Sequence, residues 1–320
     1  MSETEVIRQR LTEILTRDEY LSRVFPFTGD LSKAKFSRAK LLLKNASDNG
    51  VDLNLALEAA LGIEMVHLAT LIHDDVIDDS NLRRNEQSFR SVKGDKGAVL
   101  YGDYLFSSSV NQIQTTQNQG CSRVFVECIN TTCRGEAIQD LLLTETDYQP
   151  TLELMHEVAR GKTGALFSFC TEAPAWIANG ISESVKNALK EIGYLLGLGY
   201  QLADDVLDIA GVEENLGKPA GNDLMQNCMT TPLFVMMNHQ NLSWNELREK
   251  YVENCSLLQD DFLNGESFVE IKDQIGNIKN KLDNLVQLCN NENWEIGGIV
   301  SLFWSLYVKK RMDLLLDAKV

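Results

Sequence analysis

Two copies of the pattern Asp-Asp-x-x-Asp, each at the end of a long apolar run, constrain what this chain can fold into. The aspartates are Asp74, Asp75 and Asp78 in the first cluster and Asp204, Asp205 and Asp208 in the second. In a helix, the first and last aspartates of each cluster lie on one face, one turn apart, with the middle one beside them. Like charges at this spacing oppose helix formation, so the pattern requires a functional reason.

Binding of hard divalent cations is one such reason. Mg²⁺ takes oxygen ligands, keeps several waters and typically joins one or two protein carboxylates to phosphate oxygens. Cations follow both clusters, namely Arg83 and Arg84 after the first and Lys218 after the second. Carboxylates bordered by guanidinium and ammonium groups suit a metal-bound diphosphate. The alternative, that each cluster is only a solvated acidic face, explains one cluster more readily than two on otherwise apolar helices.

The rest of the chain has helical periodicity nearly throughout, which predicts an all-α fold. The five prolines are expected between helices, and no strand-like alternation persists. We find no linker, which predicts a single domain over residues 1–320. The predicted helices cover Glu3 to Val24, Lys33 to Asn45, Leu53 to Asp79, Lys96 to Gln114, Cys121 to Leu143, Leu152 to Phe169 and Ser182 to Ala210, with shorter helices from Pro232 to Val320.

Charge and cysteine content narrow the class of protein. The net charge of −16, without a Lys/Arg-rich stripe, argues against nucleic acid and against docking on anionic lipid. Seven cysteines without a Cys-x-x-Cys pair fit reduced thiols better than a disulfide framework. The first residues lack an apolar signal core, and no uninterrupted apolar stretch reaches membrane-spanning length. We therefore expect a soluble cytoplasmic protein rather than an integral membrane protein.

On these motifs the chain resembles the trans-isoprenyl diphosphate synthases of the polyprenyl synthetase family, from about Lys35 to Arg311. Further motifs that carry the resemblance are Gly102-Asp103-Tyr104-Leu105, Gly161-Lys162-Thr163-Gly164 and the loop Gly217-Lys218-Pro219-Ala220-Gly221-Asn222-Asp223-Leu224. The resemblance implies the isoprenoid synthase fold, a single bundle of about ten or more antiparallel helices around a central active-site cavity. It also implies a homodimer.

The resemblance gives each candidate residue a role. Three Mg²⁺ ions are expected between the two clusters, and all six aspartates are expected as metal ligands. The groups expected to carry catalysis are Asp74, Asp75, Asp78, Lys162, Asp204 and Asp205. The groups expected at the allylic diphosphate are Arg83, Lys162, Thr163, Gln201 and Lys218, and those at isopentenyl diphosphate are Lys35, Arg38, His67 and Arg84. The implied reaction is ionisation, condensation and elimination, with the released diphosphate as the base.

Three small residues on the first aspartate helix bear on product length. In the family, bulky aromatics four and five residues before the first cluster stop chain growth early, whereas this chain has Thr70 and Ala69 there, with Val66 one turn deeper. The resemblance therefore implies a product longer than farnesyl, in the heptaprenyl-to-octaprenyl range, with geranylgeranyl next.

The chain also departs from the family pattern. Lys33-Ala34 replaces two glycines, Ala39 replaces a proline, and Cys228 stands where a second lysine is usual. These departures leave open a poorly active or regulatory subunit of a heteromeric synthase, although all six aspartates are kept. A class I terpene cyclase would share the ionisation chemistry but has no need of the isopentenyl diphosphate residues. A helical scaffold without a ligand leaves both acidic clusters unexplained.

Overall fold

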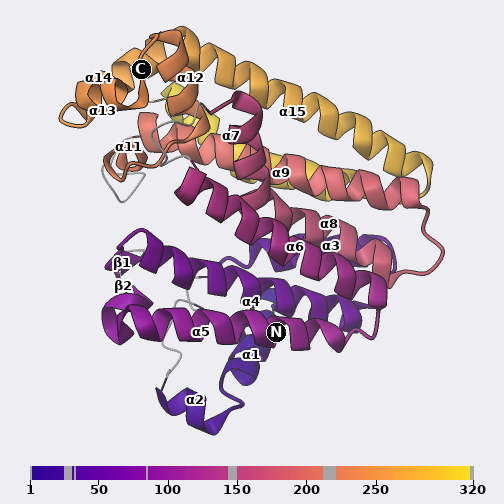
Figure 1. The fold of residues 1–320 in the computed structure, drawn as a ribbon. Coiled ribbons are helices and arrows are strands. Elements are labelled where there is room, and N and C mark those ends of the chain that lie inside the picture. Colours follow the sequence, from indigo (N-terminus) through magenta and orange to yellow (C-terminus); the bar gives the residue numbers. More distant parts are fainter. Residues whose placement is uncertain are drawn as a thin grey trace. The chain divides into compact units, whose positions relative to one another are not determined.

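A computed structural model describes residues 2–24, 31, 34–83, 86–142, 150–211 and 221–317. Helices dominate these ranges (Figure 1). Within them, the only strands are β1 (Leu82–Arg83) and β2 (Glu86–Gln87), which pair as a short antiparallel hairpin. The predicted all-α class is therefore confirmed.

The chain divides into two compact units, and each unit combines two separate stretches of sequence. Unit 1 comprises Met1–Ile129 and Phe169–Asn187, and unit 2 comprises Asn130–Ser168 and Ala188–Val320. Three helices, α6 (Gln119–Ala137), α8 (Ala165–Ile177) and α9 (Glu183–Ala210), contribute residues to both units. The units are therefore not two domains that follow one another along the chain, and the single domain over residues 1–320 stays a prediction.

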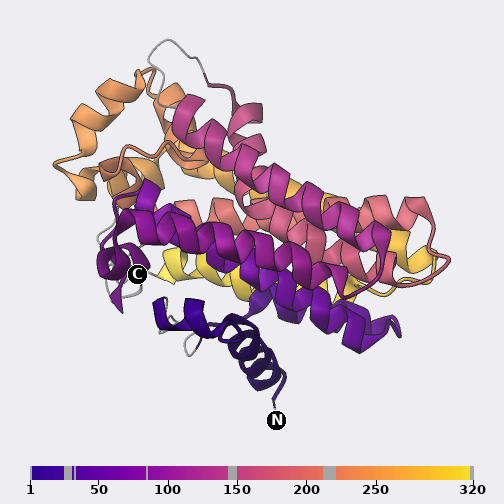
Figure 2. The ribbon, with the colours of Figure 1, turned by 60° about the horizontal axis from the view of Figure 1, so that its bottom comes forward.

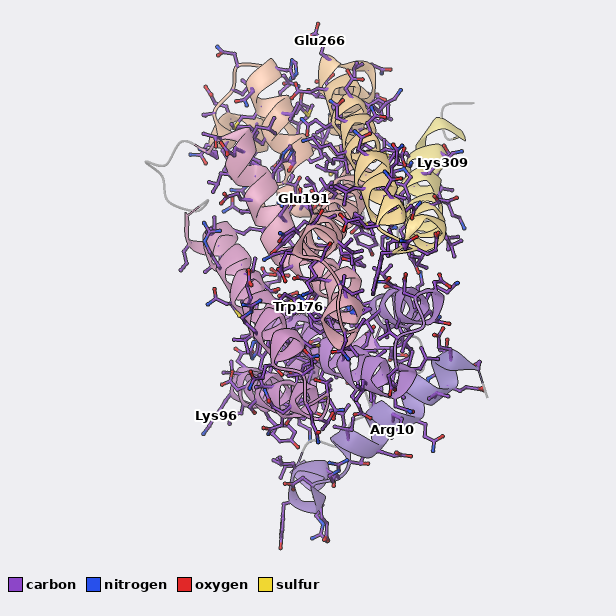
Figure 3. The ribbon with its side chains drawn as sticks, turned by 90° about the vertical axis from the view of Figure 1, so that its right-hand side faces the viewer. Arg10, Lys96, Trp176, Glu191, Glu266 and Lys309 are labelled. Atoms are coloured by element: carbon purple, nitrogen blue, oxygen red, sulfur yellow. The ribbon has the colours of Figure 1, made fainter. Side chains whose placement is uncertain are left out.

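Unit 1 is built around α4, which carries the first aspartate cluster at its end. Its helices include α1 (Glu3–Leu15), α2 (Glu19–Val24), α3 (Ser37–Asp48), α4 (Leu53–Ile77) and α5 (Phe89–Gln114). Helices α4 and α5 run side by side (Figures 1 and 2). Small buried side chains on α4, such as Ala59 and Ala60, allow close packing by its neighbours. Helix α1 is tied to α4 by Arg10, labelled in Figure 3, which pairs with Glu58 at 2.9 Å.

Helix α4 is long and apolar enough to cross a membrane by length and composition alone. The run of apolar residues in this helix is interrupted by Glu58 and Glu64, so no uninterrupted apolar stretch of that length occurs in it, although its mean hydropathy is high. Within its most apolar window, 67% of the residues are buried inside the protein. That burial is typical of a core helix.

Several predicted helix boundaries in unit 1 were wrong. The helix expected from Lys33 begins at Ser37, and two other boundaries differ for local reasons. The expected helix from Glu3 to Val24 is broken after Leu15, because the Asp18 carboxylate accepts hydrogen bonds from the backbone N–H groups of Tyr20 and Leu21 and starts α2. Helix α5 begins at Phe89, seven residues before the predicted start at Lys96. Its first turns continue through a kink at Gly94, whose φ of 73° suits glycine.

Pro174 lies inside α8, which corrects the expectation that every proline falls between helices. A proline removes one helical hydrogen bond and costs roughly 3 kcal/mol in a helix interior. Its neighbours Ala173, Ala175 and Ile177 are buried. Packing of this apolar segment therefore offsets the lost hydrogen bond, an effect that local sequence rules do not include.

Unit 2 contains the second aspartate cluster on α9 and most of the C-terminal half. Its remaining helices are α7 (Leu152–Ala159), α11 (Asn222–Met225), α12 (Thr231–His239), α13 (Trp244–Tyr251), α14 (Cys255–Asn264), α15 (Glu266–Asn291), α16 (Gly297–Trp304) and α17 (Lys310–Asp317). The prediction of only shorter helices after Pro232 was wrong, because α15 has 26 residues (Figure 1). Its buried side chains, including Ile271, Ile275, Ile278 and Leu282, recur at helical spacing across the central Gly276.

Three π-helical turns interrupt the helices of the described residues, and one of them contains the Gly-Lys-Thr-Gly motif. The turns are η1 (Ile138–Leu142), η2 (Arg160–Gly164) and η3 (Ser305–Lys309). Backbone from other helices approaches η2 at two glycines: a Cβ on Gly135 would lie 2.5 Å from the Lys162 nitrogen, and one on Gly197 would lie 2.3 Å from the Gly164 Cα. Arg160 anchors the turn through hydrogen bonds of 2.9 and 2.7 Å to Glu191, labelled in Figure 3. Single π turns of this kind are frequent at functional sites.

The close contact of Gly197 with Gly164 predicts opposite effects for two glycine-to-alanine variants. Gly197→Ala should destabilise the protein by about 1–3 kcal/mol, because the new methyl group must displace backbone. Gly276→Ala on α15 is the matched control, since no atom lies within 4 Å of its Cβ position. It should stabilise the protein by up to about 1 kcal/mol through helix propensity. Urea unfolding measures both, and equal effects would contradict the packing.

Candidate functional site

The first aspartate cluster lies at the C-terminal end of α4. Asp74 and Asp75 belong to its last turn, and Asp78 caps the helix. Asp75 is only 2% exposed, whereas Asp78 is exposed. The cluster therefore combines one buried carboxylate with others that water or a ligand can reach.

The β-hairpin brings Arg83 onto Asp75. The Arg83 guanidinium donates from Nε to both carboxylate oxygens, at 3.0 and 3.1 Å, and its Nη2 lies 2.9 Å from Oδ1. Burial nevertheless raises the pKa of Asp75 above its usual value, against the lowering effect of Arg83. A further cation near this carboxylate would favour its charged form. The structure thus brings together two of the residues predicted for diphosphate and metal binding.

His73, next to the cluster, is held by α5. Its Nε2 lies 3.2 Å from the Val99 carbonyl oxygen, and its ring packs against Phe106 at a centroid distance of 5.6 Å. A Cβ on Gly102 would lie 2.1 Å from the same nitrogen. These contacts explain the Gly102 motif as a packing requirement between α4 and α5.

The second aspartate cluster occupies the last two turns of α9. Asp204 is exposed, while Asp205 and Asp208 are 5% and 3% exposed. The Asp208 carboxylate accepts a hydrogen bond from the Asp223 backbone N–H at 3.1 Å, and its carbonyl accepts one from Gly221 at 2.7 Å. The end of α9 is therefore fixed by the segment that begins α11.

A chain of hydrogen bonds connects η2 to Asp205. Thr163 donates its hydroxyl to Gln201 Oε1 at 2.6 Å, and Gln201 Nε2 donates to Asp205 Oδ1 at 2.7 Å. Burial, followed by the nearby charge of Asp223, raises the pKa of Asp205 well above its usual value. Three predicted site residues thus meet in unit 2. Asp223, which the sequence analysis left without a role, adds a further carboxylate to their surroundings.

Lys162 projects from η2 and pairs with Glu136 of α6, with Nζ 2.8 Å from Oε2. The backbone approach at Gly135, the residue immediately before Glu136 on α6, places Lys162 and Glu136 side by side. Glu136 was not a predicted site residue, because nothing in its local sequence marks it. Only the packing of two distant segments shows that Lys162 already has a carboxylate partner.

Three of the four residues predicted to bind isopentenyl diphosphate lie around the start of α3 and on α4. Lys35 is exposed just before α3, Arg38 lies in its first turn, and His67 is half-buried on α4. Glu64, three residues before His67, accepts a hydrogen bond from the Ala39 backbone N–H at 2.9 Å. This carboxylate was also missed, and its position inside an apolar run was the available signal.

The three predicted chain-length residues differ in their surroundings. Val66 and Ala69 have no exposed surface, whereas Thr70 is half-buried. The Thr70 hydroxyl donates to the His67 carbonyl of its own helix at 2.9 Å. Thr70 is therefore the position where a larger side chain disturbs the interior of unit 1 least.

Arg311 meets the second cluster from α17. Its Nε donates to Asp204 Oδ1 at 3.1 Å, and its guanidinium lies 4.4 Å from the centre of the Tyr200 ring. The remaining predicted cations, Arg84 and Lys218, lie outside the described residues.

The donor chemistry of both clusters fits a hard divalent cation. In the described part of the chain, no three His, Cys, Asp or Glu side chains surround a common point as ready-made ligands. Mg²⁺ does not require such a cage, because one or two carboxylates, several waters and the phosphate oxygens of a substrate complete its coordination. The clusters therefore fit metal that binds together with a diphosphate.

Comparison with solved structures defines the class of fold. The heptaprenyl diphosphate synthase of Staphylococcus aureus superimposes with a TM-score of 0.79 at 26% identity, covering 96% of each chain. The polyprenyl synthase of Caulobacter crescentus, solved with calcium and isoprenyl diphosphate, gives 0.78 at 25% identity, covering 89% of this chain and 88% of that one. The predicted isoprenoid synthase fold is confirmed.

Sequence comparison gives the family. The family model for polyprenyl synthetase matches residues 30–262, so the chain belongs to the polyprenyl synthetase family, as its motifs predicted. It is 34% identical over 189 residues to heptaprenyl diphosphate synthase component 2 of Geobacillus stearothermophilus, a match over 59% of this chain and 58% of that one. It is 33% identical over 221 residues to the geranylgeranyl diphosphate synthase of Methanosarcina mazei, over 68% and 67% of the two chains. The match thus spans less than two thirds of the heptaprenyl relative.

The raised pKa of Asp205 predicts how the stability of the metal-free protein depends on pH. Because the folded-state pKa exceeds the unfolded value, ionisation of Asp205 opposes folding, and this cost is fully present above the folded pKa. Asp205→Asn should therefore raise the melting temperature at pH 8 in EDTA by about 2 °C or more, the shift that roughly 1 kcal/mol produces. The gain should shrink as the pH falls through the folded pKa.

Asp204→Asn is the matched control for this measurement, since Asp204 is exposed and paired with Arg311. It should give no gain in melting temperature at pH 8. A gain for Asp204→Asn equal to that of Asp205→Asn would contradict the assignment of the cost to burial.

Proposed function

We propose that this chain is a Mg²⁺-dependent prenyltransferase that condenses isopentenyl diphosphate with an allylic diphosphate, farnesyl or geranylgeranyl diphosphate, to a longer all-trans polyprenyl diphosphate. The observation that carries the proposal is that a member of the polyprenyl synthetase family keeps both aspartate clusters, each with at least one deeply buried carboxylate. Burying a carboxylate is costly unless a cation or donor compensates it. Asp75 and Asp205 both bear that cost, which supports a role in binding cations.

We assign Mg²⁺, with three ions expected from the family resemblance, to the carboxylates of the two clusters. Bound Mg²⁺ would neutralise the diphosphate and stabilise the negative charge that grows on it as it leaves. The raised pKa values of Asp75 and Asp205 support this assignment, because nearby positive charge favours their ionised forms.

Two cationic side chains are proposed to bind the allylic diphosphate. Arg83 and Lys162 each pair with a carboxylate, Asp75 and Glu136 respectively. Each can exchange part of that pairing for a diphosphate oxygen without being left unpaired. Gln201 is held by Thr163 and Asp205, so its amide is fixed in orientation. Lys218 is proposed as a further cation on this substrate.

The proposed reaction needs no covalent attachment to a side chain. The carbon–oxygen bond of the allylic diphosphate breaks, and both electrons leave with the diphosphate. The double bond of isopentenyl diphosphate then supplies the electron pair of the new carbon–carbon bond. A proton next to the resulting cation is lost to the released diphosphate, which restores a double bond. Lys35, Arg38, His67 and Arg84 are proposed to hold isopentenyl diphosphate during these steps.

A long-chain product, in the heptaprenyl-to-octaprenyl range, is our proposal for this chain. The small side chains at Ala69 and Thr70 support it, as do relatives named heptaprenyl and octaprenyl diphosphate synthase. The likeness to a geranylgeranyl diphosphate synthase favours a shorter product as the second candidate. We further infer a homodimer, on family resemblance, and a cytoplasmic location, which the seven free thiols support.

A subunit of a heteromeric synthase is the alternative that a specific observation favours. One relative is named as component 2 of a heptaprenyl diphosphate synthase. Cys228, where the family usually has a lysine, accepts a hydrogen bond from Gln139 at 3.0 Å and cannot replace the missing charge. Against this alternative, both clusters keep all their aspartates.

The purified chain should form polyprenyl diphosphate from isopentenyl diphosphate, farnesyl diphosphate and Mg²⁺, and EDTA should abolish the reaction. Asp75→Asn and Asp205→Asn should each lower kcat by at least about 100-fold, since each removes charge stabilisation from the transition state. Asp79→Asn is the control, because Asp79 lies just outside the cluster and pairs with Arg90. Its kcat should stay within a few-fold of wild type.

Chromatography of the dephosphorylated products measures this reaction. An inactive single chain would contradict the proposal, and recovery of activity with a second, different chain would establish the heteromeric alternative. Cyclic hydrocarbons formed from an allylic diphosphate alone would instead identify a terpene cyclase.

Thr70→Phe should shorten the product by one or more isoprene units, because an aromatic ring would block the path of the growing chain. Thr70 is the better test position, since Phe at the fully buried Ala69 would also overpack unit 1 at a cost of about 1–3 kcal/mol. Thr70→Ser, which keeps the hydroxyl, is the control and should leave product length unchanged. Unchanged length in Thr70→Phe, or farnesol as the sole wild-type product, would contradict the chain-length assignment.

A further inference from the structure

The start of α3 lacks the side-chain cap that most helices have. The backbone N–H groups of a first helical turn need acceptors, and the residue before the helix usually supplies one from a Ser, Thr, Asp or Asn side chain. Here that residue is Phe36, which has no acceptor, and its φ of 49° places it in the left-handed region. The N–H of Ala39, the third helical residue, therefore needs an acceptor from elsewhere.

Glu64 of α4 supplies that acceptor. Its Oε1 lies 2.9 Å from the Ala39 nitrogen, and the residue is only 8% exposed. The charge of Arg38 also acts on this carboxylate, against the effect of burial. Glu64 is thus a buried charged group that reaches from one helix to the first turn of another.

This contact joins three residues that the proposed function assigns to one substrate. Lys35 and Arg38 flank the left-handed Phe36, and His67 lies one turn after Glu64 on α4. The hydrogen bond between Glu64 and Ala39 therefore holds the first turn of α3 against α4. That turn positions Lys35 and Arg38, and α4 carries His67.

We propose that Glu64 is a positioning residue for isopentenyl diphosphate: its carboxylate oxygen caps the first turn of α3 through the Ala39 N–H and so holds Lys35 and Arg38 in register with His67. This inference rests on the proposed function and extends it to a residue that does not touch the substrate. The cap on the Ala39 N–H requires an acceptor oxygen at the end of a side chain as long as that of glutamate. It does not require the negative charge itself.

Three substitutions at Glu64 separate the effect of side-chain length from the effect of negative charge. Glu64→Gln keeps an acceptor oxygen at the same reach and loses the charge, and Glu64→Asp keeps the charge but withdraws the oxygen by about 1.5 Å. Glu64→Leu loses both. Asp52→Ala is the matched control, because Asp52 caps α4 in the same unit by accepting from the N–H groups of Asn54 and Leu55. It removes a helix cap far along α4 from Glu64.

Calorimetric titration with isopentenyl diphosphate alone measures binding without turnover, and steady-state kinetics give KM for each substrate. Glu64→Gln should bind within about 3-fold of wild type, whereas Glu64→Asp and Glu64→Leu should bind at least about 10-fold more weakly, a loss of about 1.4 kcal/mol. KM for the allylic diphosphate should change less than 2-fold in all three. Asp52→Ala should lose thermal stability but not isopentenyl diphosphate affinity.

Two results would overturn the inference while leaving the proposed function intact. One is wild-type affinity for isopentenyl diphosphate in Glu64→Asp, together with a loss in Glu64→Gln, which would show that charge matters rather than reach. The other is an equal loss of affinity for both substrates, which would show a general structural defect. If Glu64→Leu does not fold, the Asp and Gln variants still decide the question. A wild-type chain that binds no isopentenyl diphosphate would overturn both proposals.

Discussion

Burial of carboxylates in both acidic clusters is the constraint around which the two clusters are built. Asp75 and Asp205 lie at the ends of apolar helices, among other aspartates, where loss of water disfavours their charged forms. Each of these two carboxylates accepts a hydrogen bond from a side chain that the fold brings to it. Arg83 reaches Asp75 from the only hairpin in the described residues, and Gln201 reaches Asp205 from one turn earlier on α9. The hairpin thus has a direct electrostatic role, because it places the Arg83 guanidinium on the buried Asp75 carboxylate.

The glycine contacts around η2 serve the same chemistry by a different route. The π turn inserts an extra residue into the helix, and close backbone approach at Gly135 and Gly197 fixes the turn from two sides. Lys162 then meets Glu136, and Thr163 meets Gln201. The lysine and threonine of the Gly161-Lys162-Thr163-Gly164 motif thus make the polar contacts. The two glycines of the motif are packing residues, because a Cβ on Gly161 would lie 3.0 Å from the Gly135 Cα and one on Gly164 would lie 3.1 Å from the Tyr194 carbonyl oxygen. Their mid-helix position, which weakens helix propensity, is explained by the packing.

The sequence predicts well the strongly periodic helices that carry the two clusters, because these helices depend on local spacing. It fails where a distant contact decides the outcome. The helix through Pro174 persists because its neighbours are buried, and α15 continues through Gly276 because its apolar face is covered. Glu64, Glu136 and Arg311 acquire partners 25, 26 and 107 residues away in sequence, so no spacing rule identifies them. Periodicity predicts which face of a helix is buried, but not which buried charge faces which donor.

The loss of two glycines before Lys35 illustrates how such contacts change the interpretation of a motif. Glycines there would allow a tight turn at little cost. The structure instead has a left-handed Phe36, a conformation that costs a non-glycine residue about 1–2 kcal/mol. Burial of the Phe36 ring, which is 3% exposed, and the bond from Ala39 to Glu64 offset that cost. The turn is thus stabilised by tertiary contacts rather than by glycine, and the departure from the family motif does not by itself indicate a lost binding site.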